Sequence, residues 1–127
     1  VLVYEDKIVS RGYNRRAKLQ LASAHAEMMA IDKACKKFHS WRLPEGCELF
    51  VTLEPCPMCM GAILWAGIKA VYYGCNTKDT ENIGFRDEVF YRMLNSEDMG
   101  ITYSEYDREE CLKLFRDYSE RADKQLY

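Results

Sequence analysis

The sequence lacks any long apolar run. Crossing a bilayer takes about 20 consecutive apolar residues, and no stretch of the 127 residues approaches that length. The N-terminus also lacks the charged, apolar and small-residue leader that is typical of secreted proteins. We therefore expect neither membrane insertion nor secretion, and we expect a cytoplasmic protein.

Net charge is also small, at -2 with an isoelectric point of about 5.7. Proteins that bind nucleic-acid phosphates usually carry a basic face or tail. The basic clusters here are short and comprise Arg15, Arg16 and Lys18, followed by Lys33, Lys36 and Lys37. This distribution disfavours a nucleic-acid partner without excluding one.

Histidine is limited to two residues, whereas there are six cysteines. Without a leader, the cysteines indicate reduced thiols in a cytosol rather than a disulfide framework. Two of them stand at metal-ligand spacing, and we expect the other four, Cys35, Cys47, Cys75 and Cys111, to be small buried apolar residues. The length and a hydrophobic content of 48% suit one domain over residues 1–127.

Apolar periodicity and turn formers predict strands that alternate with helices. The expected strands are 1–4, 8–12, 47–53, 69–74 and 101–106, and the expected helices are 24–38, 59–66, 86–94 and 109–124. Residues 14–23 are typical of a loop, with Ser23 as the N-cap of the first helix. The order predicts an α/β fold with a mixed, largely parallel sheet and helices on both faces.

Two short motifs carry the chemistry, His25-Ala26-Glu27 and Pro55-Cys56-Pro57-Met58-Cys59. Two thiolates and one imidazole suit zinc, and a catalytic zinc keeps three protein ligands with the fourth position left to water. Both motifs fall at expected helix starts, where ligand sites gather in α/β folds. We expect His25, Cys56 and Cys59 to bind one zinc ion.

No fourth ligand stands at a suitable position, which favours an open site. His39 lies at the far end of the first helix from His25, and Cys35 is roughly 15 Å along that helix. Glu27 is the candidate proton carrier, because the start of its helix directs it toward the same cavity as His25. We expect it to take a proton from a bound water and pass it to a leaving amine.

Each motif alone has a less specific interpretation. Cys-x-x-Cys also occurs in cytosolic redox pairs, and a single histidine at a helix start is often a surface or capping residue. A zinc module used only for binding is a further alternative. The combined pattern is the signature of zinc nucleobase deaminases, which favours catalysis.

From about Gly12 to Gly74 the sequence resembles the cytidine deaminase-like superfamily. The resemblance lies in Ala24–Met28 and Thr52–Ile63, and it is greatest to the branch that holds tRNA adenosine deaminases and bacterial guanine deaminases. It implies a three-layer α/β/α fold, of which the N-terminal helix is absent from this chain. It also implies hydrolytic deamination, one zinc per subunit, a homodimer, and an Asn14 side chain that hydrogen-bonds the base.

The second half resembles guanine deaminases more than the tRNA enzymes. Ile-Gly-Phe-Arg-Asp at 83–87 is similar to their Gly-Phe-Asp-Asp segment, whose second aspartate, matched by Asp87, recognises the purine. Arg86 departs from the first aspartate. The resemblance further implies that Trp65 contacts the base and that Tyr127 enters an active site, with the C-terminal segment exchanged between subunits.

Simpler roles stay open for these residues. Asp87 also suits a helix cap, Trp65 a core position and Tyr127 a frayed terminus, while Asn14 is a common type of turn residue.

The chemistry of a carboxylate favours guanine among the bases. It only accepts hydrogen bonds, and guanine presents two donors, N1–H and the 2-amino group, side by side. We therefore expect a deaminase of purine metabolism that converts the free base guanine to xanthine and ammonia. The alternatives are a tRNA adenosine deaminase, which acts on a flipped-out anticodon base, and a deaminase of cytosine or another small base.

Overall fold

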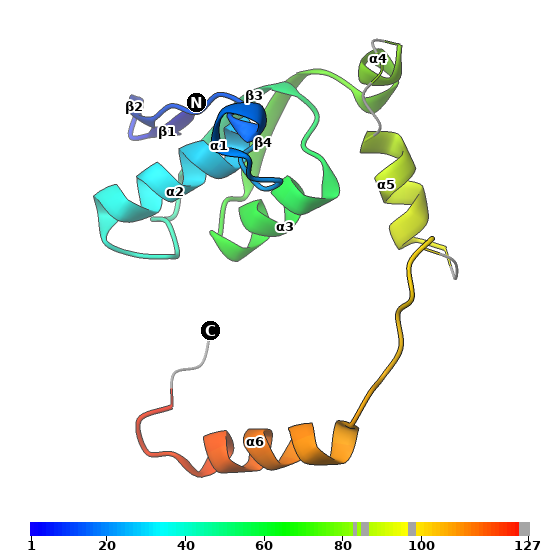
Figure 1. Cartoon of the computed structure of the whole chain (residues 1–127). Coiled ribbons are helices and arrows are strands. Elements are labelled where there is room, and N and C mark those ends of the chain that lie inside the picture. Colours follow the sequence, from blue (N-terminus) through cyan, green and yellow to red (C-terminus); the bar gives the residue numbers. More distant parts are fainter. Residues whose placement is uncertain (83, 85–86, 97–98, 125–127) are drawn as a thin grey trace. The chain divides into compact units, whose positions relative to one another are not determined.

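The computed structural model describes residues 1–82, 84, 87–96 and 99–124 (Figure 1). The chain divides into two compact units, Val1–Ser96 and Glu97–Tyr127, which we name unit 1 and unit 2. The expected single domain over residues 1–127 stays a prediction.

Unit 1 contains a four-stranded mixed sheet with the order β2-β1-β3-β4. Its strands are β1 (Leu2–Tyr4), β2 (Lys7–Ser10), β3 (Glu48–Leu53) and β4 (Ala70–Cys75). β1 is antiparallel to both β2 and β3, whereas β3 and β4 are parallel. Three strands thus point the same way, but β1 lies between two of them. Most pairings are therefore antiparallel, and the sheet is less parallel than predicted.

A two-residue turn joins β1 to β2. Glu5 and Asp6 have positive φ angles of 48° and 58°, as in the type I′ turn whose twist matches that of a hairpin. Tyr4 and Lys7 pair directly across the turn. The predicted opening hairpin is confirmed.

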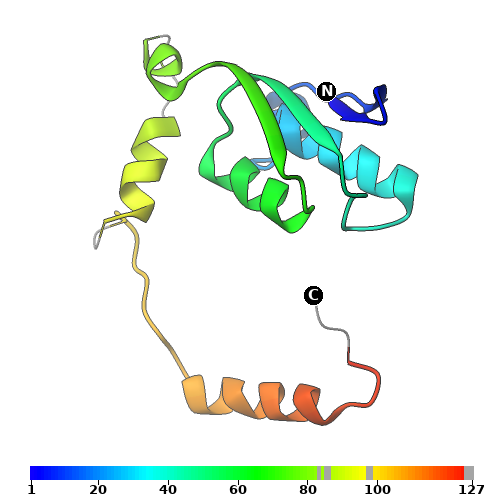
Figure 2. The same cartoon turned by 180° about the vertical axis from the view of Figure 1, so that it is seen from behind.

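Two helices, α2 (Ala26–Phe38) and α3 (Pro57–Trp65), lie on one side of the sheet (Figures 1 and 2). Leu2 and Leu49 of the strands and Ile63 of α3 share one core and are at most 1% exposed. Burying each such side chain contributes about 1.5–3 kcal/mol. This packing fixes the starts of both helices, where the two zinc motifs lie.

Two short helices were not predicted, α1 (Arg16–Leu19) and α4 (Thr77–Glu81). α1 is a single turn within the expected loop, too short to show an apolar period. α4 begins with a capping box, in which Asn76 accepts the N–H of Asp79 and the Asp79 carboxylate accepts the N–H of Asn76. This pattern is a helix-start signal that is visible in the sequence. α5 (Asp87–Leu94) follows as predicted.

Unit 2 contains α6 (Arg108–Glu120), which confirms the predicted last helix although it ends earlier than 124. The predicted strand at 101–106 is wrong, since residues 99–107 form neither helix nor strand. Strand propensity acts through pairing and packing, and none of the described strands pairs with this segment. In the described part of the chain, each helix is too short or too polar to cross a membrane.

All six cysteines are free thiols. Cys47 is buried and Cys35 is half-buried, in keeping with small apolar residues. The prediction is wrong for Cys75 and Cys111, which are exposed. Cys75 ends the edge strand β4, and Cys111 lies on a helix that has no buried residue.

Candidate metal centre and substrate site

The two zinc motifs lie at the starts of α2 and α3. His25 is the N-cap residue of α2 and Cys56 is that of α3, both with extended backbone. Neither side chain makes a capping hydrogen bond to its own helix, so both can be directed to a metal. Ser23 was predicted as the N-cap, but its carbonyl accepts the N–H of His25 at 2.8 Å, and the helix begins beyond this tight turn.

The three predicted ligand atoms lie together. His25 Nδ1 is 3.6 Å from the Sγ atoms of both Cys56 and Cys59, and all three atoms lie within 4.8 Å of one another. Zinc bonds of about 2.3 Å to sulfur and about 2.05 Å to nitrogen, at tetrahedral angles, place sulfur and nitrogen about 3.6 Å apart. The side chains therefore fit a zinc ion. Within the described residues no second group of this kind occurs.

The electrostatics of the two cysteines favour a bound cation. A hydrogen bond from Cys59 lowers the pKa of Cys56 to about 6. The same bond, followed by burial and the charge of Glu27, raises the pKa of Cys59. A thiol whose pKa is lowered ionises more readily, and the thiolate is the form that binds a metal ion. The positive ends of the α2 and α3 dipoles also stabilise negative charge here.

Glu27 lies beside this cluster. It stands in the first turn of α2 and is half-buried, and its charge and a hydrogen bond contribute to the raised pKa of Cys59. The proton-carrying role of Glu27 stays a prediction.

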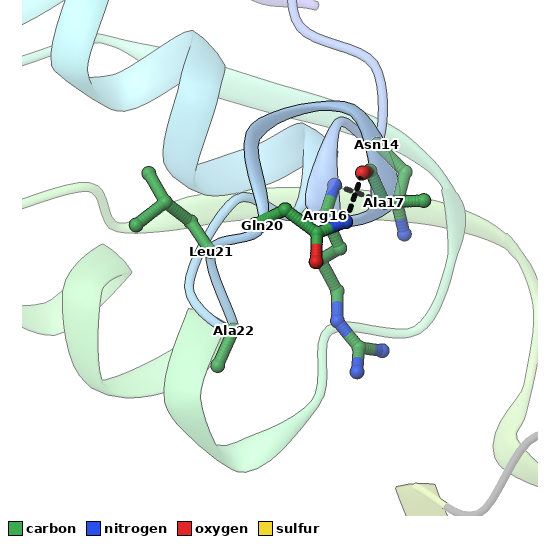
Figure 3. Close-up of a pocket in the computed structure, with 6 residues that line it drawn as sticks. All are labelled: Asn14, Arg16, Ala17, Gln20, Leu21 and Ala22. Atoms are coloured by element: carbon green, nitrogen blue, oxygen red, sulfur yellow. Dashed lines mark hydrogen bonds between the residues drawn. The ribbon is translucent and has the colours of Figure 1, made fainter.

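Asn14 lines an open pocket of about 540 Å³ on the segment that leads to His25 (Figure 3). The lining residues are Asn14, Arg16, Ala17, Gln20, Leu21 and Ala22. Asn14 Oδ1 accepts the N–H of Arg16 at 3.0 Å, as expected of an asparagine in a turn. The contact of Asn14 with a base stays a prediction.

Sequence reasoning missed a set of hydrogen bonds that ties α4 and α5 to the segment before Cys56. The Tyr91 hydroxyl donates to the Pro55 carbonyl at 2.7 Å. The N–H of Thr77 donates to Glu54 Oε2 at 3.0 Å, and its hydroxyl donates to Glu88 Oε2 at 3.1 Å. The sequence gives little indication of these hydrogen bonds. The one hint is that Tyr91 lies one helical turn after Asp87, and therefore on the same face of the helix.

Asp87 is the first residue of α5 and is half-buried. Burial first, and then the charges of Cys56, Glu54, Asp87 and Cys59, raise the pKa of Tyr91. Tyr91 is therefore close to both Asp87 and the metal cluster, and α5 borders the site.

Trp65, another predicted site residue, lies at the far end of α3 from the metal centre. Trp65 ends α3, about 13 Å along the helix axis from Cys56, and is 60% exposed. A core position is therefore wrong for Trp65, and its contact with a base stays a prediction. Tyr127 lies outside the described residues.

Residues 1–75 match the family described as the cytidine and deoxycytidylate deaminase zinc-binding region. The guanine deaminase of Bacillus subtilis strain 168 is 36% identical over 129 residues, covering 100% of this chain and 82% of that protein. The tRNA-specific adenosine deaminase of the same organism is 50% identical over 74 residues, covering 58% of this chain and 45% of that protein.

The fold matches a solved structure over the whole chain. The X-ray structure of guanine deaminase from Bacillus subtilis superposes with a TM-score of 0.90 at 34% identity, covering 100% of this chain and 82% of that one.

Proposed function

The chain belongs to the cytidine and deoxycytidylate deaminase zinc-binding family, and we propose that it hydrolyses the free base guanine to xanthine and ammonia. The observation that carries the choice of substrate is the hydrogen bond from Tyr91 to Pro55. It holds α5, which begins at Asp87, beside the segment that presents Cys56. The similarity to a guanine deaminase over the full chain supports the same choice.

His25, Cys56 and Cys59 hold the zinc, which when bound supplies a water whose pKa is lowered to about 7. Glu27 accepts a proton from the attacking water and donates it to the departing 2-amino nitrogen of guanine. Its half-buried position in the first turn of α2 limits exchange of that proton with bulk water.

Asn14 and Asp87 recognise the base in complementary ways, Asn14 as a hydrogen-bond donor and Asp87 as an acceptor. Because Asn14 Oδ1 already accepts the N–H of Arg16, its NH₂ group donates to an acceptor of the base such as O6 or N7. Asp87 accepts from N1–H and from the 2-amino group. Guanine offers this combination, whereas adenine and cytosine lack the adjacent pair of donors.

The segment before Cys56 uses its backbone groups for structure. Glu54 N–H donates to the Cys75 carbonyl at 2.8 Å, and the Pro55 carbonyl accepts from Tyr91. Both bonds hold this segment in place beside Cys56.

A tRNA adenosine deaminase is the second candidate. It is favoured by the 50% identity to such an enzyme over 74 residues and by Arg16, a cation in the same pocket as Asn14. Binding that depends on phosphates weakens steeply as the salt concentration rises, which distinguishes this candidate from a free-base enzyme.

The cellular setting is part of the proposal. Six free thiols suit the reducing environment of a cytoplasm. We infer a homodimer with an exchanged C-terminal segment, in which Trp65 and Tyr127 wall the pocket, and a place in purine metabolism. Neither a membrane nor nucleic acid is required.

The test is ammonia release from the zinc-loaded protein with guanine, guanosine, cytosine, adenine, adenosine and an anticodon stem-loop measured side by side. We expect turnover of guanine, and we expect Asp87→Asn to lower its kcat/KM about 100-fold, since two hydrogen bonds to a charged group are weakened. Asp32→Asn, on the exposed face of α2, is the matched control and leaves turnover unchanged. Turnover of the stem-loop alone would overturn the proposal.

A further inference from the structure

We propose that Tyr91 is a positioning residue, which acts through the Pro55 carbonyl to hold α5, with Asp87 at its start, against the segment that presents Cys56. This inference rests on the proposed function, because it concerns how Asp87 is placed to meet the base.

The bond that Tyr91 makes is short and partly buried, and its acceptor belongs to a buried residue. Its hydroxyl is 2.7 Å from the Pro55 carbonyl oxygen, and Pro55 is among the most completely buried residues of the described chain. A buried carbonyl that loses its partner is costly, because water cannot replace the donor. The bond therefore fixes the distance between α5 and the residue next to Cys56.

Tyr91 and Asp87 are four residues apart on α5, so they lie on the same face one turn from each other. Long side chains in a helix lean toward its N-terminus, which brings the Tyr91 ring toward the turn that carries Asp87. Anchoring the hydroxyl thus limits both the rotation of α5 about its axis and its sliding past the metal centre.

A second tie runs through α4 and joins the same two segments. Glu88 accepts the hydroxyl of Thr77, and the N–H of Thr77 donates to Glu54. α5 is therefore linked twice to the segment before Cys56. Tyr91 bonds to it directly, and Glu88, about one helical turn earlier, is linked to it through Thr77. Two separated links fix the orientation of α5 relative to this segment, whereas a single link would let the helix rotate about it.

A side chain that only stabilises the fold would make the same contacts, so the test must detect action through Asp87. In the zinc-loaded protein, Glu27→Gln slows turnover enough for the dissociation constant of guanine to be measured by calorimetry. We expect Tyr91→Phe to weaken binding about tenfold, as follows from the loss of one partly buried hydrogen bond, with the zinc content unchanged.

The decisive comparison is the same substitution in the presence of Asp87→Asn. If Tyr91 acts by placing the carboxylate, Tyr91→Phe weakens binding less than twofold once that carboxylate is gone. An equal tenfold loss in both backgrounds would assign Tyr91 a general structural role and overturn the proposal, as would the absence of any effect.

Tyr72→Phe is the matched control. It also removes a tyrosine hydroxyl that donates to a side chain, Glu48 Oε1 at 3.3 Å, but on the exposed sheet. We expect it to leave guanine binding unchanged. Thr77→Val, which cuts the second tie, should reproduce the effect of Tyr91→Phe, so the conclusion does not depend on one variant.

Hydrogen exchange without any base separates failure of this inference from failure of the proposed function. We expect amides of residues 87–94 to exchange faster in Tyr91→Phe than in the parent or in Tyr72→Phe. If the parent binds no guanine but this acceleration is seen, the proposed substrate is wrong and the tie is real. If exchange is unchanged, Tyr91 does not hold α5.

Discussion

At the residue scale, Glu27 differs from the three metal ligands because its replacement leaves the zinc site intact. It stands beside Cys59 but is not one of the three residues whose ligand atoms gather. We predict that Glu27→Gln retains zinc, because all three ligands stay. Its kcat should fall about 10²- to 10⁴-fold, the usual contribution of a positioned proton carrier.

Zinc content by elemental analysis and ammonia release, measured on the same sample, check this prediction. Glu45→Gln, in the exposed turn before β3, is the control and keeps the parental activity. Turnover that survives in Glu27→Gln would remove the proton-carrying role. A parent protein that holds zinc but deaminates none of the tested bases would favour the binding-module alternative.

The second prediction at this scale concerns removal of the metal from His25, Cys56 and Cys59. A chelator should abolish turnover and lower the melting temperature, and added zinc should restore both. Binding to the folded state alone stabilises it by about 4 kcal/mol when free zinc is 1,000 times its Kd.

Differential scanning calorimetry with and without zinc makes that measurement. Cys59→Ala should melt at the same temperature with and without the metal. Cys111→Ser, on the exposed surface of α6, should respond to zinc as the parent does. If zinc does not change the melting temperature of the parent protein, the proposed site that links α2 to α3 is contradicted.

At the scale of elements, the close approach of the chain after β2 to α2 depends on Gly12. A Cβ atom there would clash with the Ala26 carbonyl oxygen and would lie 2.8 Å from the Ala30 nitrogen. Both are backbone atoms, so α2 would have to move. We predict that Gly12→Ala lowers the free energy of unfolding by roughly 3 kcal/mol.

Gly61→Ala is the contrasting substitution, because its Cβ would meet no atom within 4 Å. Within α3, alanine is favoured over glycine by about 0.5–1 kcal/mol, so we expect a small gain in stability. Urea unfolding of both variants with zinc present compares them. Equal stabilities would contradict the tight contact between Gly12 and α2.

At the scale of the whole molecule, the end of the chain is expected to complete the site. We predict that deleting Leu126 and Tyr127 lowers kcat/KM for guanine at least tenfold, because the pocket loses an aromatic wall. Steady-state kinetics of the truncated and parent proteins test this, and unchanged kinetics would remove Tyr127 from the site.

Mixing subunits then shows whose site the tyrosine completes. The truncated chain and Glu27→Gln are each impaired for a different reason. If Tyr127 acts in the partner subunit of a homodimer, mixed dimers contain one intact site and recover activity. If it acts within its own subunit, mixing recovers none.

The sequence by itself determined the chemistry of the metal centre and the elements that present it. His25, Glu27, Cys56 and Cys59 could be singled out because zinc ligands are of few kinds and each of the two motifs is a run of neighbouring residues. The hairpin, α2, α3 and α5 were predictable for a similar reason, since apolar periodicity and turn formers act over neighbouring residues.

Tertiary structure alone decided how distant segments meet. The strand predicted at 101–106 failed because pairing depends on a partner elsewhere in the chain, and the exposure of Trp65 and Cys75 depends on what covers them. The bond from Tyr91 to Pro55 joins residues 36 apart, and no local pattern specifies it. The metal-binding motifs depend on neighbouring residues and are therefore visible in the sequence. The position of α5 beside the metal centre depends on packing across unit 1 and is not.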